Sequence, residues 1–193
     1  MGTLANILSG KADVYYKAWT GSDNDPVSNN TIDLTGWTQF GFQTEDGVTI
    51  NYEAEFLEEK VQEFNDFVIR ELVGEMLQVN FNLKEADLEQ MALAIPGATY
   101  TEGATPGTNP NVLKIGDPSD PSLVEYSLAV RGKASTGANN LLLFFPKMTA
   151  VGPVAQSYSK GAVRVTPFQW KSLADTGRSA GETLAVFYEI TQS

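Results

Sequence analysis

The chain contains no cysteine and no histidine among its 193 residues. Without cysteine there is no disulfide, no thiolate nucleophile and no Cys/His zinc site, and without histidine there is no imidazole base or ligand. These absences remove most familiar catalytic machinery. We therefore predict a protein that is not an enzyme and that binds no metal and no cofactor.

Long apolar runs are also missing. No wholly apolar run is longer than that of Leu141 to Phe145, which is far shorter than the roughly 20 residues that a membrane-spanning helix needs. The N-terminal residues lack the basic and apolar regions of a secretion signal. We expect a soluble, unsecreted protein with no membrane partner.

Basic residues are scarce, with 13 Lys and Arg against 24 Asp and Glu. The acidic excess lies almost wholly in residues 45–89, which hold 13 acidic and 3 basic residues, whereas residues 90–193 hold 7 acidic and 8 basic ones. Tight binding of nucleic acid needs clustered basic residues, so the composition disfavours it. An acidic surface can still face nucleic acid by repelling it.

The pattern of apolar residues predicts mainly β structure. Residues 48–56 and 77–83 alternate between apolar and polar side chains, which is typical of half-buried antiparallel strands. Further strands are predicted at 12–19, 122–132, 139–149, 160–171 and 182–191, and residues 58–73 favour strands around a turn. We expect one domain over residues 1–193, built as a β-sandwich or barrel of about seven or eight antiparallel strands flanked by one helix.

The helix follows the strand at 77–83. There the apolar residues stop recurring at every second position and begin to recur with the spacing of a helix. Its apolar stripe has the spacing i, i+3, i+4 and i+7, and we assign it to packing on the sheet. The stripe consists of Leu88, Met91, Ala92 and Ile95. Pro96 and Gly97 end the helix.

Two polar segments, 20–36 and 98–121, predict long loops. They are rich in Gly, Pro, Asn, Asp and Thr, and bare coil of that length is uncommon in a compact domain. We expect each loop to be either functional or disordered.

One set of residues leaves a catalytic or carbohydrate-binding alternative open. Glu53 and Glu55 would lie about 6.6 Å apart along a strand, a spacing that suits an inverting glycosidase. Trp19, Trp37 and Trp170 would supply an aromatic platform for a glycan. We favour a solvated or lumen-facing strand for the two glutamates, because nothing in the sequence gives them the differing environments that a catalytic acid and base need.

The order of elements resembles a known structural family. The segment NFNLKEADLEQMALAIPG combines an alternating strand with a short helix that ends in Gly, and LLLFFPKMTAVG, VRVTPFQWKSLADTG and LAVFYEI look like closing strands. Over residues 45–192 this pattern is similar to the major tail, or tail tube, proteins of long-tailed bacteriophages.

The resemblance implies a structural virion protein, assembled in the host cytoplasm and located in the phage tail. Such proteins form hexameric rings that stack into a tube, and DNA passes through it without specific binding during ejection into the host. The implied partners are further copies of the chain, a tape measure protein inside the tube, and the tail-tip or baseplate and tail-terminator proteins. A tail-terminator or neck ring protein is the alternative within the same class.

The resemblance also implies roles for particular residues. The acidic candidates for facing the lumen are Glu53, Glu55, Glu58 and Glu63, and the alternative wetted face consists of Gln78, Asn80 and Asn82. The acids would otherwise meet basic residues of a neighbouring copy, namely Lys114, Arg131, Lys133 or Lys147. In the 20–36 loop, the candidates for contact with the next ring are Asp23, Asp25, Asn29 and Asn30.

Overall fold

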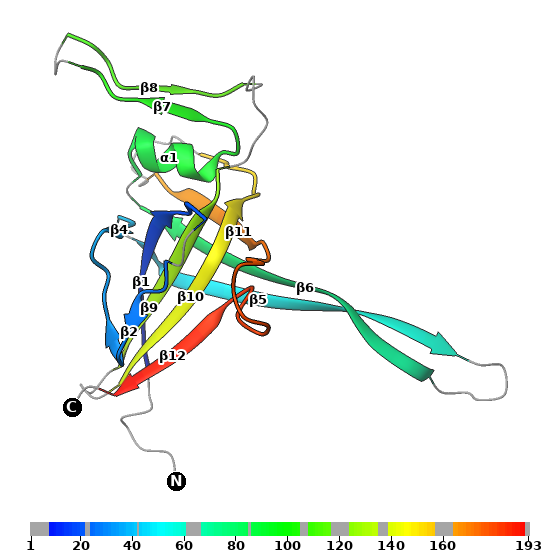
Figure 1. The fold of residues 1–193 in the computed structure, drawn as a ribbon. Helices are drawn as coiled ribbons and strands as arrows, with labels where there is room; N and C mark the ends of the chain where they lie inside the picture. Colours follow the sequence, from blue (N-terminus) through cyan, green and yellow to red (C-terminus); the bar gives the residue numbers. More distant parts are fainter. Residues whose placement is uncertain are drawn as a thin grey trace.

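The computed structural model describes residues 8–21, 24–41, 43–60, 67–84, 86–104, 108–116, 124–134, 139–156 and 164–191 (Figure 1). The long strands are β1 (Leu8–Ala18), β5 (Gln43–Lys60), β6 (Phe67–Leu83), β9 (Tyr126–Ala134), β10 (Asn139–Ala150), β11 (Thr166–Ser172) and β12 (Val186–Thr191). The short ones are β2 (Val27–Ser28), β3 (Thr31–Ile32), β4 (Thr38–Gln39), β7 (Thr99–Thr101) and β8 (Val112–Lys114). One helix, α1 (Leu88–Ala94), completes the described elements, which confirms the mainly-β prediction.

Eight strands form one antiparallel sheet in the order β4-β1-β9-β10-β11-β6-β5, with β12 also joined to β10. The sheet forks at β10, because residues 139–144 of this strand pair with β12 whereas residues 148–150 pair with β11. Beyond the fork, β11 continues into β6 and β5. The two branches of the sheet therefore separate on one side of β10.

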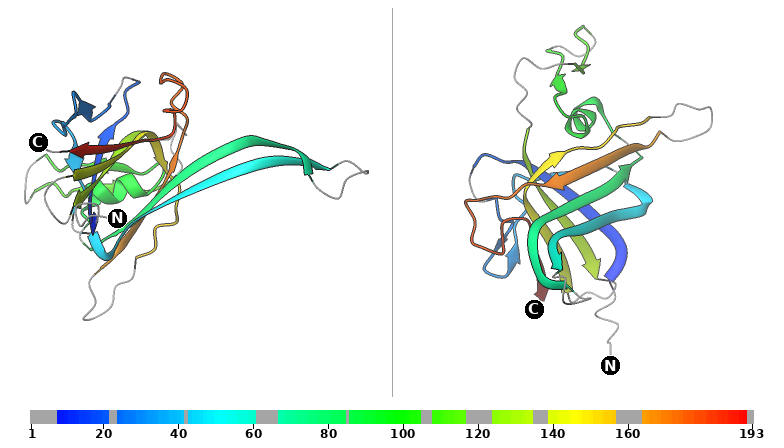
Figure 2. Two further views of the ribbon diagram at one scale, coloured as in Figure 1. Left: turned by 90° about the horizontal axis from the view of Figure 1, so that it is seen from below. Right: turned by 90° about the vertical axis from the view of Figure 1, so that its right-hand side faces the viewer.

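The main core lies on the inner side of the curled sheet (Figure 2). Trp170, Phe168 and Phe145 are fully or almost fully buried there. Phe168 stacks on Phe81 of the neighbouring strand with ring centroids 5.1 Å apart. Such aromatic pairs stabilise the fold beyond their area burial, and they hold β11 firmly against β6.

The opposite side of β10 has an apolar layer of its own. Leu142 and Phe144 are fully buried, although strand alternation directs them away from the main core. The segment between β1 and β4 covers them, since Pro26 is buried and Trp37 packs edge-on against Phe144 at a centroid distance of 6.1 Å. The segment at 20–36, predicted as a long loop, is thus in large part a cover for the sheet.

Helix α1 lies across one end of the sheet, with the β7–β8 hairpin beyond it (Figure 1). Asp87 is its N-cap and accepts a hydrogen bond from the Gln90 backbone N–H at 2.7 Å. The predicted packing stripe is partly wrong: Leu88 is 37% exposed and Ile95 is the C-cap, while Ala94 is the buried residue. A seven-residue helix is only about 10 Å long, so a stripe from i to i+7 does not fit within it.

Short hairpins occupy parts of both predicted loops. In the first, β2 pairs with β3 around Asn29 and Asn30, whose φ angles are 50° and 59°. Asn tolerates this left-handed conformation, and a two-residue hairpin turn needs it. In the second, β7 pairs with β8.

Candidate functional site: a polar face and a projecting arm

Three neighbouring strands present a largely polar surface, which we call the polar face and which is interrupted by Met76 opposite Glu53 and by Pro167 opposite Asn82. Strand register places Thr49 opposite Asn80 and Asn51 opposite Gln78, and on the other side Gln169 lies opposite Asn80. The Gln78 side-chain amide donates to Asn80 Oδ1 at 2.8 Å. The polar face consists of Thr49, Asn51, Glu53 and Glu55 on β5, Gln78, Asn80 and Asn82 on β6, and Gln169 and Lys171 on β11.

Strict alternation along the strands creates the polar face. The residues between its members, such as Ile50, Val79 and Phe168, lie on the opposite side and pack in or against the core. Side chains of successive residues point to opposite faces of a sheet, so one face buries apolar area while the other keeps amides, hydroxyls and carboxylates in solvent. Two groups of residues that the sequence left as alternatives, the glutamates and the amides, thus share one surface.

Glu58 lies on the opposite side of its strand. Its carboxylate pairs with Arg70 at 3.0 Å, and the Arg70 guanidinium lies over the Phe56 ring, 4.6 Å from the centroid. The prediction that Glu58 shares a surface with Glu53 and Glu55 is wrong. Residues that lie an odd number of positions apart along a strand point to opposite faces of the sheet. Glu63 lies outside the described residues.

The outer parts of β5 and β6 form a two-stranded projection that we call the arm, residues 53–60 and 67–76. It extends away from the rest of the molecule in Figure 1 and in the left view of Figure 2. Four of its large apolar side chains are strongly exposed: Phe56 (44%), Leu57 (47%), Leu72 (45%) and Val73 (55%). The register shifts between Glu55 and Phe56, and such bulges bend and twist a ribbon.

At the base of the arm lies a hollow of about 630 Å³, which we call the fork hollow. It opens between β12 and the β6–β5 branch of the forked sheet. Its lining residues are Ile50, Tyr52, Glu75, Leu77, Leu143, Gly181, Thr183, Leu184, Ala185 and Phe187. Several of these pack against the main core, so the hollow is an open end of that core.

The segment after β1 is tied to its own protomer. Asp25 Oδ2 accepts hydrogen bonds from Arg178 Nη2 at 2.9 Å and from the Tyr188 hydroxyl, while Asp25 Oδ1 accepts from the Val27 backbone N–H. Burial and the hydrogen bond to Asp25 raise the pKa of Tyr188. Asp25 is therefore engaged within its protomer, against the prediction that it contacts a further ring.

The remaining candidates of the 20–36 segment are Asp23, Asn29 and Asn30. Asn29 and Asn30 are exposed at the β2–β3 turn, and Asp23 lies outside the described residues.

Among the basic candidates for contact with a neighbouring copy, Lys147 forms an ion pair with Glu125 at 3.0 Å. Its Nζ atom lies 4.1 Å from the centroid of the Trp19 ring. Lys147 is thus also held within its own protomer.

The three tryptophans do not form a common platform. Trp170 is fully buried in the core, Trp37 packs on Phe144, and the ring of Trp19 lies beneath Lys147. A glycan-binding surface needs exposed aromatic faces in one plane, which this arrangement does not provide.

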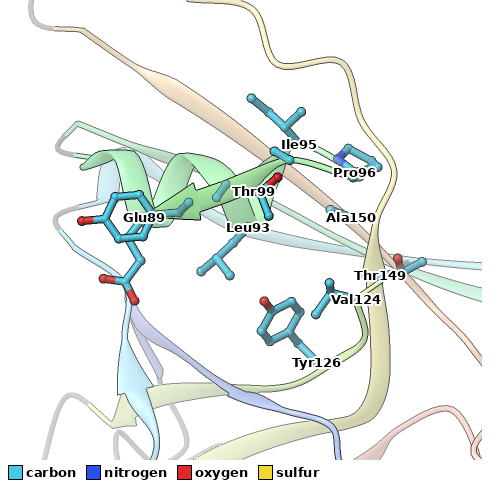
Figure 3. A pocket seen from close by; sticks show the side chains of 13 residues that line it. Glu89, Leu93, Ile95, Pro96, Thr99, Val124, Tyr126, Thr149 and Ala150 are labelled. Carbon is cyan, nitrogen blue, oxygen red and sulfur yellow. The ribbon is translucent and has the colours of Figure 1, made fainter. Parts of the chain in front are cut away.

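A second hollow, of about 260 Å³, lies between α1 and the sheet (Figure 3). Leu93, Tyr126 and Thr149 contribute to its wall together with Glu89. Burial, and to a lesser degree the charge of Glu89, raises the pKa of Tyr126. A neutral phenol and a single carboxylate supply no acid–base pair with separated roles.

Comparison with known proteins yields no assignment: no protein-family model matches the chain, and no curated protein is significantly similar to it. Within the described residues, no group of three acidic side chains is placed to hold a metal ion. In the same residues, no helix has both the length and the apolar character to cross a bilayer.

Proposed function

We propose that this protein is a structural virion component that assembles into rings, and that the rings stack into the tail tube of a long-tailed bacteriophage. The observation that carries the proposal is the polar face, a surface of amides, hydroxyls and carboxylates across β5, β6 and β11. Behind Thr49, Asn51 and the amides of β6, the other side of these strands packs in or against the core, whereas the strand side behind Glu53 and Glu55 carries the exposed Tyr52 and Phe56. Such a sheet suits the wall of a wet channel, with the core behind it.

The chemistry of the polar face suits the passage of DNA. Glu53 and Glu55 are exposed and repel phosphates, while uncharged amides such as Gln78 and Asn80 offer few strong contacts to the backbone. Repulsion between exposed charges acts over roughly 8–10 Å at physiological salt. A duplex in such a channel is kept from the wall and slides without specific binding.

Open strand edges support assembly. Among the described residues, β5 pairs only with β6 and β12 pairs only with β10, so each strand has an edge without a neighbouring strand. Exposed edges pair with other chains unless they are covered. Contacts between different surfaces of identical subunits close into rings when the rotation permits, and a second such contact along the axis produces a filament.

The resemblance in sequence adds independent support. The strand and helix of NFNLKEADLEQMALAIPG are present as the end of β6 and α1, and the three closing segments correspond to β10, β11 and β12. Under this proposal the tape measure protein and the tail-tip and terminator proteins are the further partners.

Negative-stain electron microscopy over a range of protein and salt concentrations tests the proposal. We expect hollow tubes or stacks of rings. Discrete rings that never stack would instead indicate a terminator or neck protein. Monomers at all concentrations, including after addition of preformed tail tips, would overturn the proposal.

A charge reversal tests the polar face itself. Tubes of the Glu53→Lys/Glu55→Lys variant should retain a short fluorescent DNA duplex at least tenfold more than wild-type tubes, because the lining becomes basic, and salt should release it. The control variant is Glu89→Lys/Glu102→Lys, which reverses two exposed acids on the helix side. Equal retention by both variants would show that Glu53 and Glu55 do not line the channel.

A further inference from the structure

The hollow of about 260 Å³ between α1 and the sheet, which we call the helix hollow, has a wall of mixed chemistry. Glu89 and Leu93 of α1 line it from one side, and Tyr126 of β9 lines it from the other (Figure 3). Its volume far exceeds the roughly 30 Å³ that a water molecule takes up in the liquid. The helix hollow therefore has room for a small organic group.

The charge at the helix hollow is acidic. Glu89 is exposed, and the lining residues that the structure describes include no basic side chain. Of the ion pairs formed within the described parts of the chain, none involves Glu89. Its carboxylate can therefore accept hydrogen bonds from a cation that comes from outside this part of the chain.

Tyrosine residues contribute aromatic rings to the same place. Tyr100 of β7 and Tyr126 both line the helix hollow. The Tyr126 ring packs edge-on against Tyr16, with 6.0 Å between the centroids, and against Trp170, with 5.5 Å between them. These two contacts hold the Tyr126 ring in place. Aromatic rings attract cations to their faces, so the wall suits a positively charged guest.

The phenols around the helix hollow lie in the field of acidic residues. Burial raises the pKa of Tyr16 and of Tyr126, and the charge of Glu89 raises both further. For Tyr100, loss of hydration raises the pKa first, followed by the charges of Glu102 and Glu89. All three phenols thus stay neutral at physiological pH. A positive guest would meet a carboxylate and uncharged aromatic rings.

We propose that the helix hollow binds an alkylammonium group, with the charge beside the Glu89 carboxylate and the carbon chain against Leu93 and the Tyr126 ring. An ammonium group has three donors and no acceptor, so it needs the oxygen atoms and aromatic faces that this wall presents. A neutral or anionic guest gains less from both. The site is separate from the polar face and does not rest on the proposed function.

Amide NMR signals of dilute, isotope-labelled protein test the proposal, with n-butylammonium as the probe. We expect saturable shifts at residues 89–100, 124–126 and 149–150, which hold the lining of the hollow. Two controls of similar shape, neutral n-butanol and anionic butyrate, should bind more weakly by about threefold or more. Equal binding of n-butanol, shifts spread over the whole chain, or no saturable shift would overturn the proposal.

Matched variants test the role of the carboxylate. Glu89→Gln keeps the shape of the side chain and should weaken n-butylammonium binding by about threefold or more, because it removes the charge. Glu53→Gln removes an exposed charge from the polar face instead and should leave the binding unchanged. Equal weakening by both variants would indicate an effect of net charge alone. That result, or unchanged binding by Glu89→Gln, would contradict a site at Glu89.

A second pair of variants tests the aromatic ring. Tyr126→Leu should weaken the binding, whereas Tyr126→Phe, which keeps the ring, should bind like the wild type. Circular dichroism and thermal melts verify that each variant is folded. Wild-type binding by a folded Tyr126→Leu variant would show that the guest does not contact this ring.

An alkylammonium group occurs both in free amines and in lysine side chains, and repeating the titration with N-acetyl-lysine amide separates these sources. Tighter binding than that of n-butylammonium would assign the site to a lysine of another polypeptide, and weaker binding would assign it to a free amine. None of these measurements requires assembly. Failure of this site would therefore leave the proposed tube untouched, and failure to form tubes would leave the site untouched.

Discussion

The body and the arm use the same residue types in opposite ways. In the body, Phe144 is fully buried. The Arg178 side chain is only 8% exposed and forms an ion pair with Asp25. In the arm, Phe56 is 44% exposed, and Arg70, 64% exposed, bonds with Glu58. Phe144 and Arg178 are therefore enclosed by their own protomer, whereas Phe56 and Arg70 of the arm remain largely exposed to solvent.

Replacing one phenylalanine in the body and one in the arm tests this contrast and should give the largest difference in stability. Phe144→Ala should lower the free energy of unfolding by about 3–5 kcal/mol, because it removes a fully buried ring and leaves a cavity. Phe56→Ala in the arm should lower it by less than about 1 kcal/mol. Urea denaturation of dilute protein, followed by tryptophan fluorescence, measures both. Equal losses would mean that the arm belongs to the cooperative core.

Arginine gives the second comparison. Arg178→Ala should destabilise the protein by about 3 kcal/mol, because Asp25 loses its charged partner in a nearly buried site. Arg70→Ala should cost less than about 1 kcal/mol, since exposed ion pairs contribute little. Hydrogen exchange adds a local readout: residues 24–28 should lose protection only in the Arg178 variant. Unchanged protection there would contradict the role assigned to Arg178.

Replacing Tyr188 should have the smallest effect on the free energy of unfolding, and that effect should depend on pH. The pKa of Tyr188 is raised in the fold, so its neutral form is favoured there, and the resulting stability is present below about pH 10 and lost as the pH rises further. Tyr188→Phe should cost about 1 kcal/mol at neutral pH through the lost hydrogen bond. It should also make the decline above pH 10 shallower.

The matched variant is Tyr52→Phe at the base of the arm, where the hydrogen bond to Glu75 raises the pKa of an exposed phenol. Its unfolding free energy should follow the wild-type pH profile closely, because solvent screens an exposed group. Thermal melts between pH 7 and pH 11 compare the three proteins. A Tyr188→Phe profile parallel to wild type would show that Asp25 does not hold this phenol in solution.

Local patterns predicted the elements well where one face is buried. The alternation in residues 48–56 and 77–83 led directly to β5 and β6, because burying one side of a strand forces a period of two. The helix was also found, and it ends at Ala94 with Ile95 as its C-cap, just before the predicted stop at Pro96 and Gly97. Its packing residues were partly missed, since periodicity shows which side chains share a stripe and does not show where a short helix meets the sheet.

Some features of the site had no local signal. Nothing around Asp25 indicates that Arg178 and Tyr188, far along the chain, bind its carboxylate. The exposure of Phe56 and Leu72 is likewise invisible in the sequence, because large apolar side chains occur in the strands of the core and in those of the arm.

By itself, the sequence determined the mainly-β class, the concentration of acid in residues 45–89, the lack of thiol and imidazole chemistry, and the division of β5 into a polar and an apolar side. These properties depend on residue type and spacing alone. Only the tertiary structure decided that the polar sides of β5, β6 and β11 merge into one face, that the sheet forks at β10, and that the hairpin projects as an arm. Those outcomes depend on which strands pair across long separations, and the pairing is set by the packing of the whole core.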